Sequence, residues 1–144
     1  MKERDIFWEL REDQLLALVM WAEARNESYD GIRAVGSVIL NRREKNGWFG
    51  HNLYEVILKP FQFSCFNSND PQFTKLVNMA SNFGYAYAKI ASLRTCHYLA
   101  EGLLDGTIKK YDDITHYHTV DCNPHWDDHM KLVMTLGNHE FYMG

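Results

Sequence analysis

The stretch Trp21–Arg42, WAEARNESYDGIRAVGSVILNR, decides the fold and places the most prominent acid of the chain. Glu23 stands near the end of an apolar helix that includes Met20 and Trp21, and a second helix follows directly. Apolar surroundings remove water from a carboxylate and disfavour its charged form, so we expect a raised pKa for Glu23. A raised pKa is what a general acid requires at neutral pH.

A simpler interpretation is that Glu23 forms an ion pair with Arg25 or Arg42 on a solvated face. Acidic side chains are seldom buried, so a solvated ion pair is the usual interpretation of a glutamate in a helix. Motifs elsewhere in the chain are needed to favour a catalytic acid over a solvated ion pair.

Length and composition predict one domain, residues 1–144, large enough to bury about two-thirds of its unfolded surface. Aromatic residues make up 14%, which suggests stacking surfaces in a groove as well as a core. The net charge of −4 argues against a nucleic-acid binder, which would present a basic stripe. Sugar rings also stack on aromatic side chains, so carbohydrate is a better expected ligand than nucleic acid.

Three widely spaced cysteines without a CxxC pair make a disulfide framework unexpected. The first residues, MKERDIFWELRED, are too charged for a signal peptide, and no apolar run approaches a membrane span. We therefore expect synthesis in the cytoplasm without a signal peptide and no membrane partner. The oligomeric state cannot be read from the sequence.

Apolar periodicity and capping residues predict a mainly helical chain. The expected helices run from Asp13 to about Arg25, from Ser28 or Asp30 to a stop at Gly47, from Asn52 to Pro60, from Asp70-Pro71 to Met79, and onward to Asp105 with Gly106 as the stop. Alternation in Thr115–Thr119 and two β-prone runs around Gly137 predict a small antiparallel sheet. The fold class is therefore α+β, predominantly helical.

Histidines are crowded near the end of the chain, which raises the possibility of a zinc site. The group comprises His116, His118, His125, His129 and His139, with Asp121 and Cys122 among them. Zinc prefers imidazole and thiolate ligands, so His116, His118 and Cys122 form a candidate set. No HExxH or paired CxxC motif accompanies them, and we favour histidines that hydrogen-bond or line a polar groove.

Other catalytic motifs are missing from the sequence. There is no GxSxG, no Cys-His signature, no P-loop and no GxGxxG, so no cofactor is expected. Cys65 in QFSCF is predicted to be a small buried residue.

Five segments in order resemble one family. They are Glu23-Ala-Arg25-x-Glu27 with Gly31 and Ala34–Arg42, then Gln62-Phe63-Ser64, then Thr115-His116-Tyr117-His118, then Pro124-x-Trp126, and last Gly137-x-His139-x-Phe141-Tyr142. Over Leu15–Tyr142 the chain resembles the SleB/CwlJ cell-wall hydrolases, the spore-cortex-lytic type of peptidoglycan enzyme. The order and spacing of the five segments make the resemblance specific.

The resemblance implies a lysozyme-like helical domain that cleaves peptidoglycan glycan strands between N-acetylmuramic acid and N-acetylglucosamine. It maps the catalytic acid of the family onto Glu23. The expected substrate-binding residues are Gln62, Phe63, Ser64, His116, Tyr117, Trp126 and His139, with no metal ligand.

Hydrolysis of a glycoside usually needs two carboxyl groups, and the only second candidates are Glu27, Asp30 and Asp127. We therefore favour a lytic transglycosylase, in which Glu23 alone acts as acid and then base. A zinc amidase using the late histidines and a non-catalytic wall-binding module remain as alternatives. Release to the wall would require a holin or another export route, as for a phage endolysin; a bacterial origin fits equally.

Overall fold

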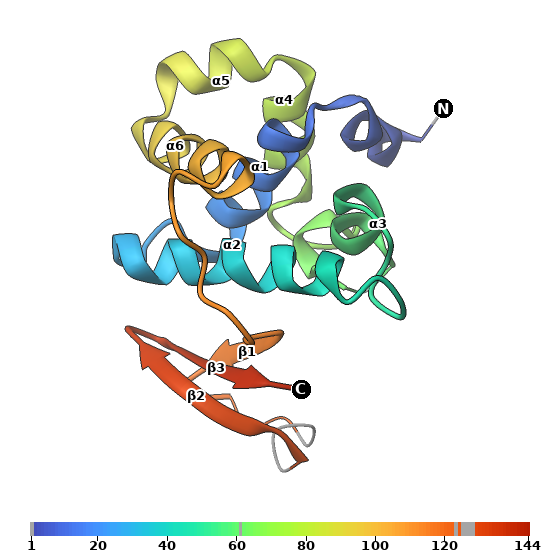
Figure 1. The fold of residues 1–144 in the computed structure, drawn as a ribbon. Coiled ribbons are helices and arrows are strands. Elements are labelled where there is room, and N and C mark those ends of the chain that lie inside the picture. Colours follow the sequence, from blue (N-terminus) through green and yellow to red (C-terminus); the bar gives the residue numbers. More distant parts are fainter. Residues whose placement is uncertain (1, 61, 123, 125–128) are drawn as a thin grey trace.

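The computed structural model describes residues 2–60, 62–122, 124 and 129–144 (Figure 1). A layer of helices lies above a small sheet, with the amino terminus among the helices and the carboxyl end in the sheet. Trp126, His125 and Asp127, which the sequence nominated, lie outside the described residues.

Helices come first along the chain and strands last. The elements are η1 (Glu3–Glu9), α1 (Glu12–Ala24), α2 (Tyr29–Glu44), α3 (Leu53–Leu58), η2 (Ser64–Phe66), α4 (Phe73–Ser81), α5 (Phe83–Lys89), α6 (Ala91–Asp105), β1 (His116–Thr119), β2 (Lys131–Leu136) and β3 (His139–Met143). This order confirms the predicted α+β class with helix dominant. No helix in the described ranges is long and apolar enough to cross a membrane.

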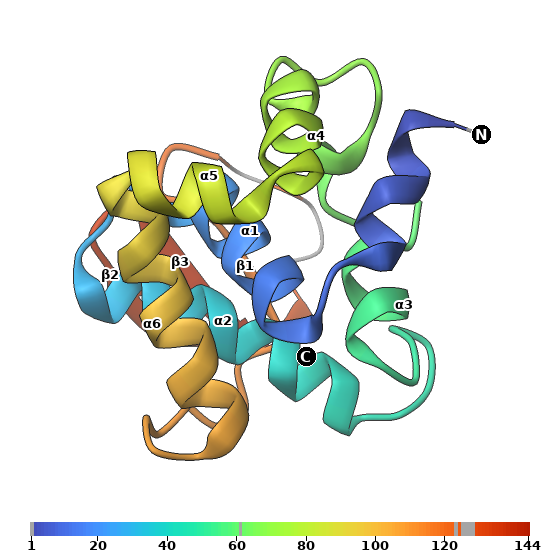
Figure 2. The same ribbon diagram turned by 90° about the horizontal axis from the view of Figure 1, so that it is seen from above.

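Helix α1 occupies the middle of the helical layer (Figure 2). Every side chain from Leu15 to Ala22 is buried, so the helix is covered on all sides. Neighbouring helices supply that cover, α6 and α2 among them. The end of a fully covered helix therefore delivers Glu23 to the interior side of the molecule.

Capping confirms some predicted helix ends and corrects others. Ser28 caps α2, and its Oγ accepts a hydrogen bond from the Gly31 amide at 3.2 Å. Asp13 was expected to cap α1, but the N-cap is Arg11, because Asp13 instead meets His97 Nε2 at 2.7 Å. Gly47 was expected to stop α2, but the helix ends at Glu44.

Two further boundaries differ from the prediction. Helix α4 begins at Phe73 and not after Asp70, because Asp70 Oδ1 accepts from the Gln72 amide at 2.9 Å and holds a turn there. The long helix expected before Gly106 is broken at Ile90, whose extended backbone separates α5 from α6. Gly106, at φ +84°, ends α6 as predicted.

The sheet is antiparallel with strand order β1-β3-β2. Tyr117 pairs with Phe141 and Thr119 with His139, so these four side chains share one face. His116 and His118 share the opposite face. Gly137, at φ +56°, supplies the turn between β2 and β3 that the sequence predicted.

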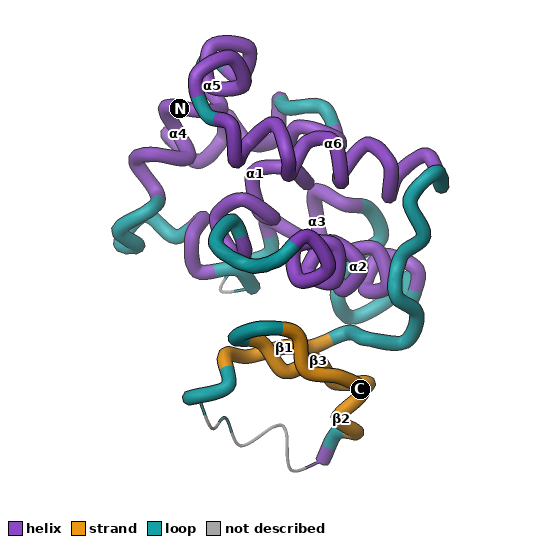
Figure 3. Tube along the Cα trace, turned by 90° about the vertical axis from the view of Figure 1, so that its left-hand side faces the viewer, coloured by secondary structure: helices purple, strands orange, loops and turns teal. Residues whose placement is uncertain are grey.

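Helix α2 lies between the other helices and the sheet (Figure 3). The buried Asn41 joins the two layers: its Nδ2 donates to the carbonyls of Tyr111 and Ile114, each at 2.9 Å. Arg42 Nε donates to the Thr115 carbonyl at 2.7 Å. These bonds hold the segment that leads into β1 and thereby set the position of Tyr117.

Candidate active site

Glu23 occupies the last turn of α1, where the helix end meets the sheet face that carries Tyr117. The Tyr117 hydroxyl donates a hydrogen bond to Glu23 Oε1. Tyr117 stands 94 positions further along the chain, so only the fold brings the two together. The contact joins the first motif of the chain to the Thr-His-Tyr-His motif.

The pKa of Glu23 is raised above the ordinary value. Burial is the largest cause, because it removes water from the charged form. The Tyr117 hydrogen bond lowers the pKa, the negative charge of Asp70 raises it, and the positive charge of Arg42 lowers it. The net direction confirms the expectation from the apolar surroundings of Glu23.

The alternative of a solvated ion pair between Glu23 and Arg25 does not match the structure. The Arg25 guanidinium lies over the Trp21 ring, 4.0 Å from its centroid, and donates to Gln72 Oε1 at 2.7 Å. Gln72 Nε2 also donates to the Ala22 carbonyl at 3.2 Å. Arg25 thus fastens the turn at residues 70–72 to the end of α1 and leaves Glu23 for Tyr117.

A cavity of about 270 Å³ opens beside the acid, and we call it the acid cavity. Its walls are the end of α1, the following loop and the β2–β3 turn. The lining residues are Ala22, Glu23, Ala24, Arg25, Asn26, Glu27, Thr119, Asn138 and His139. A ligand in this cavity can therefore reach the carboxyl group of Glu23.

Glu27, a candidate second carboxylate, is committed to the β2–β3 turn. Its carboxylate accepts from the Asn138 amide at 2.9 Å and from Asn138 Nδ2 at 3.1 Å. Burial raises the pKa of Glu27, but these hydrogen bonds outweigh burial and the pKa is lowered. Glu27 is therefore an ionised turn anchor. Asp30 is largely exposed and lies 3.5 Å from Arg33.

His139 lines the acid cavity as a neutral ring. Burial lowers its pKa, and the nearby Glu27 opposes this effect. His139 Nδ1 lies 3.4 Å from Glu27 Oε1, and the imidazole meets the Tyr117 ring edge-on at 5.3 Å between centroids. His139 thus lies in the cavity lining, and its contact with a substrate stays a prediction.

Arg42 is a buried site residue, whereas the sequence suggested it only as an ion-pair partner of Glu23 on a solvated face. Its side chain is buried beside the rings of Phe49 and Phe63, at 5.1 and 5.4 Å from the centroids. Phe63, expected to contact the substrate, is only 4% exposed and instead supports Arg42. The sequence carries a signal for the burial of Arg42, because Arg42 follows Ile39 by three residues and so continues the apolar stripe of α2.

His116 was expected near the acid, but the strand register places it on the opposite sheet face from Tyr117. Its ring packs against Phe49 at 5.6 Å between centroids. Burial, with the charges of Arg42 and Lys45, lowers the pKa of His116 to about 4. His116 is therefore neutral at neutral pH and does not face Glu23.

The Gln-Phe-Ser segment also falls beside the acid cavity and not within its lining. Gln62 is half-buried in a turn in which its amide donates to the Lys59 carbonyl at 3.1 Å. Ser64 begins η2 and is exposed. Both residues could meet only a substrate that extends beyond the cavity.

The late histidines do not assemble into a metal site within the described ranges. No three His, Cys, Asp or Glu side chains there are placed to hold one metal ion. His118 Nδ1 lies 2.7 Å from the Thr119 carbonyl oxygen, and its ring stacks on Tyr142. Cys122 is exposed, whereas Cys65 is buried as predicted.

Comparison with known proteins gives one match. The family model described as Cell Wall Hydrolase matches residues 26–142. The match covers most of the chain and begins three residues after Glu23. Neither the curated proteins nor the solved structures contain a match.

Proposed function

The chain belongs to the cell wall hydrolase family, and from this premise we propose that it cleaves the glycan strand of peptidoglycan as a lytic transglycosylase. Degradation of cell-wall peptidoglycan is the activity of the family as a whole. The bond that is cut and the type of reaction, transglycosylation or hydrolysis, are our proposals.

One observation carries the proposal: a carboxyl group with a raised pKa borders an open cavity. At neutral pH such a group holds its proton more often than an ordinary glutamate and can give it to a glycosidic oxygen. The Tyr117 hydroxyl bonds to Oε1 and thereby fixes the orientation of the carboxyl group.

In the proposed reaction Glu23 first donates its proton to the glycosidic oxygen while the bond from that oxygen to C1 of N-acetylmuramic acid breaks. The C6 hydroxyl of the same sugar then attacks C1, and the Glu23 carboxylate takes the hydroxyl proton. The products are a free N-acetylglucosamine 4-hydroxyl and a 1,6-anhydro muramic end. One carboxyl group serves as acid and then as base, and no water is consumed.

The second candidate is hydrolysis with Asp70 as the base that activates water. Its negative charge raises the pKa of Glu23, so the two groups interact electrostatically. From the sequence, Asp70 was expected only to begin a helix. We favour transglycosylation because Asp70 is absent from the lining of the acid cavity and its Oδ1 already accepts from the Gln72 amide.

Product masses and the variant Asp70→Asn separate these chemistries. We expect anhydro ends from digested peptidoglycan and a loss below about tenfold in Asp70→Asn, since one neighbouring charge is altered. Removal of that charge should also lower the pKa of Glu23. Hydrated reducing ends together with a loss of 100-fold or more, on the scale of a lost catalytic base, would instead assign Asp70 to hydrolysis.

Tyr117→Phe should move the alkaline limb of the pH–rate profile to higher pH. The Tyr117 hydrogen bond lowers the pKa of Glu23, so its removal raises that pKa further. Activity depends on protonated Glu23 and is lost as the pH rises through its pKa, so the variant should stay active at higher pH. Tyr85→Phe, at an exposed and distant tyrosine, is the matched control. If the alkaline limb of Tyr117→Phe does not move, the pH dependence of the rate does not report the protonation of Glu23.

A zinc amidase is the competing enzyme class, and it would need ligands from outside the described ranges. Loss of lysis with a chelator and recovery with zinc would support it. For either enzyme we propose that the protein reaches the wall through a holin or another export route.

A further inference from the structure

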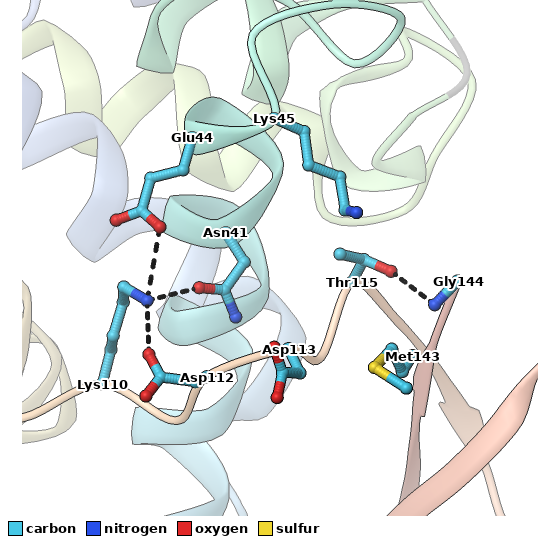
Figure 4. Close-up of a pocket in the computed structure, with 9 residues that line it drawn as sticks. All are labelled: Asn41, Glu44, Lys45, Lys110, Asp112, Asp113, Thr115, Met143 and Gly144. Carbon is cyan, nitrogen blue, oxygen red and sulfur yellow. Dashed lines mark hydrogen bonds and ion pairs between the residues drawn. The ribbon is translucent and has the colours of Figure 1, made fainter.

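A second cavity, of about 490 Å³, lies between the end of α2 and the end of β3 (Figure 4). We call it the lysine cavity. Its lining residues are Asn41, Glu44, Lys45, Lys110, Asp112, Asp113, Thr115, Met143 and Gly144. It is larger than the acid cavity, and five of its nine lining residues carry charge. Such a cavity suits a polar, charged ligand.

On one wall of the lysine cavity the ammonium group of Lys110 already has three partners, two of them carboxylates. Lys110 Nζ bonds to Asn41 Oδ1 at 2.7 Å and to Asp112 Oδ1 at 2.8 Å, and it lies 3.4 Å from Glu44 Oε2. Figure 4 shows these three partners around the ammonium group. This cluster shapes the wall and leaves no charge of Lys110 for a ligand.

Two opposite charges in the lysine cavity remain without a partner. Within the described part of the chain, neither the Lys45 ammonium nor the Asp113 carboxylate makes a hydrogen bond or an ion pair. The two side chains reach the cavity from different elements, Lys45 from the end of α2 and Asp113 from the segment before β1. A ligand that carries both a carboxylate and an ammonium group would satisfy both.

The lysine cavity and the acid cavity lie toward opposite ends of β3: Met143 lines the first and His139 the second, and four strand residues span about 13 Å. Thr115 lines the lysine cavity, and the Thr115 carbonyl accepts from Arg42 Nε at 2.7 Å. Tyr117, which holds Glu23, follows two residues later, and two strand residues span about 7 Å. A substituent of about four extended peptide residues, which span about 13 Å, is long enough to reach from a sugar at Glu23 to the lysine cavity.

We propose that the lysine cavity binds the peptide stem of peptidoglycan, with a stem carboxylate at Lys45 and a stem ammonium at Asp113. The inference rests on the proposed cleavage of the glycan at Glu23. Stem peptides branch from muramic acid, the sugar that the proposed reaction converts, and they carry free carboxylates and the amine of a dibasic residue. The enzyme would therefore prefer peptide-bearing glycan to bare glycan.

Isothermal titration calorimetry with a soluble, uncross-linked stem tetrapeptide tests the binding without any turnover. We expect Lys45→Met and Asp113→Asn each to weaken binding by about tenfold, the scale of a hydrogen bond to a charged group. Asn retains the volume and tolerates the φ of +72° at position 113. Lys89→Met, an exposed lysine on α5, is the matched control and should bind as wild type.

Chemically modified peptides test which peptide group binds Lys45 and which binds Asp113. Amidation of the stem carboxylates should remove the difference between wild type and Lys45→Met, and acetylation of the amine should remove the difference for Asp113→Asn. No binding of the tetrapeptide by wild type, or equal affinities in Lys45→Met and Lys89→Met, would overturn the proposal.

Activity measurements then separate this inference from the proposed function. Lys45→Met should raise KM about tenfold on peptide-bearing glycan and leave turnover of amidase-stripped glycan unchanged. If wild type fails to cut either glycan but still binds the tetrapeptide through Lys45, the proposed cleavage fails and the binding site stands. If it cuts both equally well and binds no peptide, the cleavage stands and the binding site fails.

Discussion

Glu23→Gln is expected to lower peptidoglycan turnover by about 100-fold or more, the usual contribution of a general acid. Glutamine keeps the size of the side chain, and its carbonyl oxygen can still accept the Tyr117 hydrogen bond. It has no proton to give to the glycosidic oxygen. Rates of glycan cleavage on purified peptidoglycan, with thermal unfolding as a check of the fold, measure the effect.

The matched control for this variant is Glu9→Gln, an exposed glutamate in η1 that should cleave at the wild-type rate. A Glu23→Gln protein that retained more than a fifth of wild-type turnover would exclude Glu23 as the acid. If wild type and Glu23→Gln both bound walls equally and neither cleaved them, the protein would be a non-catalytic wall-binding module.

Asn41→Ala is expected to reduce the free energy of unfolding by about 3 kcal/mol. The partly buried carbonyl of Tyr111 and the buried carbonyl of Ile114 would lose their Asn41 donor, and an unsatisfied buried group costs about 1–3 kcal/mol. For a chain of this length the change corresponds to a fall of about 10 °C in Tm. Cleavage should also fall, because these bonds position the segment before β1 and hence Tyr117.

Asn41→Asp tests whether the lost donors cause the effect. Aspartate has nearly the same volume and keeps an acceptor for Lys110 Nζ, but it has no N–H donor when ionised. Loss of the two donated bonds should therefore still destabilise the protein. Asn78→Ala, at an exposed position of α4, should change Tm by no more than about 2 °C, as for an ordinary surface substitution. A stable Asn41→Asp would mean that a cavity, and not the missing hydrogen bonds, destabilises Asn41→Ala.

Most of the fold follows from local sequence signals. The apolar run in α1, the Ser28 cap, the Asn52 cap and the stop at Gly106 each act within a few residues, and each is present in the structure. The errors occur where a tertiary contact displaced a local preference. Asp13 bonds to His97 instead of capping α1.

The candidate site was predicted less completely than the fold. Glu23, Tyr117 and His139 lie together, as the motifs implied. Asp70 was not predicted as a neighbour of the acid, and Arg42 was considered only as a solvated ion-pair partner. The charges near Glu23 depend on the path of the chain in space and not on sequence spacing.

The sequence by itself determined the helices, the turn between β2 and β3, and an acid in apolar surroundings, since these arise from interactions among neighbouring residues. Only the tertiary structure decided that Tyr117, and not His116, meets Glu23. The physical reason is the strand register: side chains alternate between the faces of a sheet, and a shift of one residue would turn Tyr117 away from the acid.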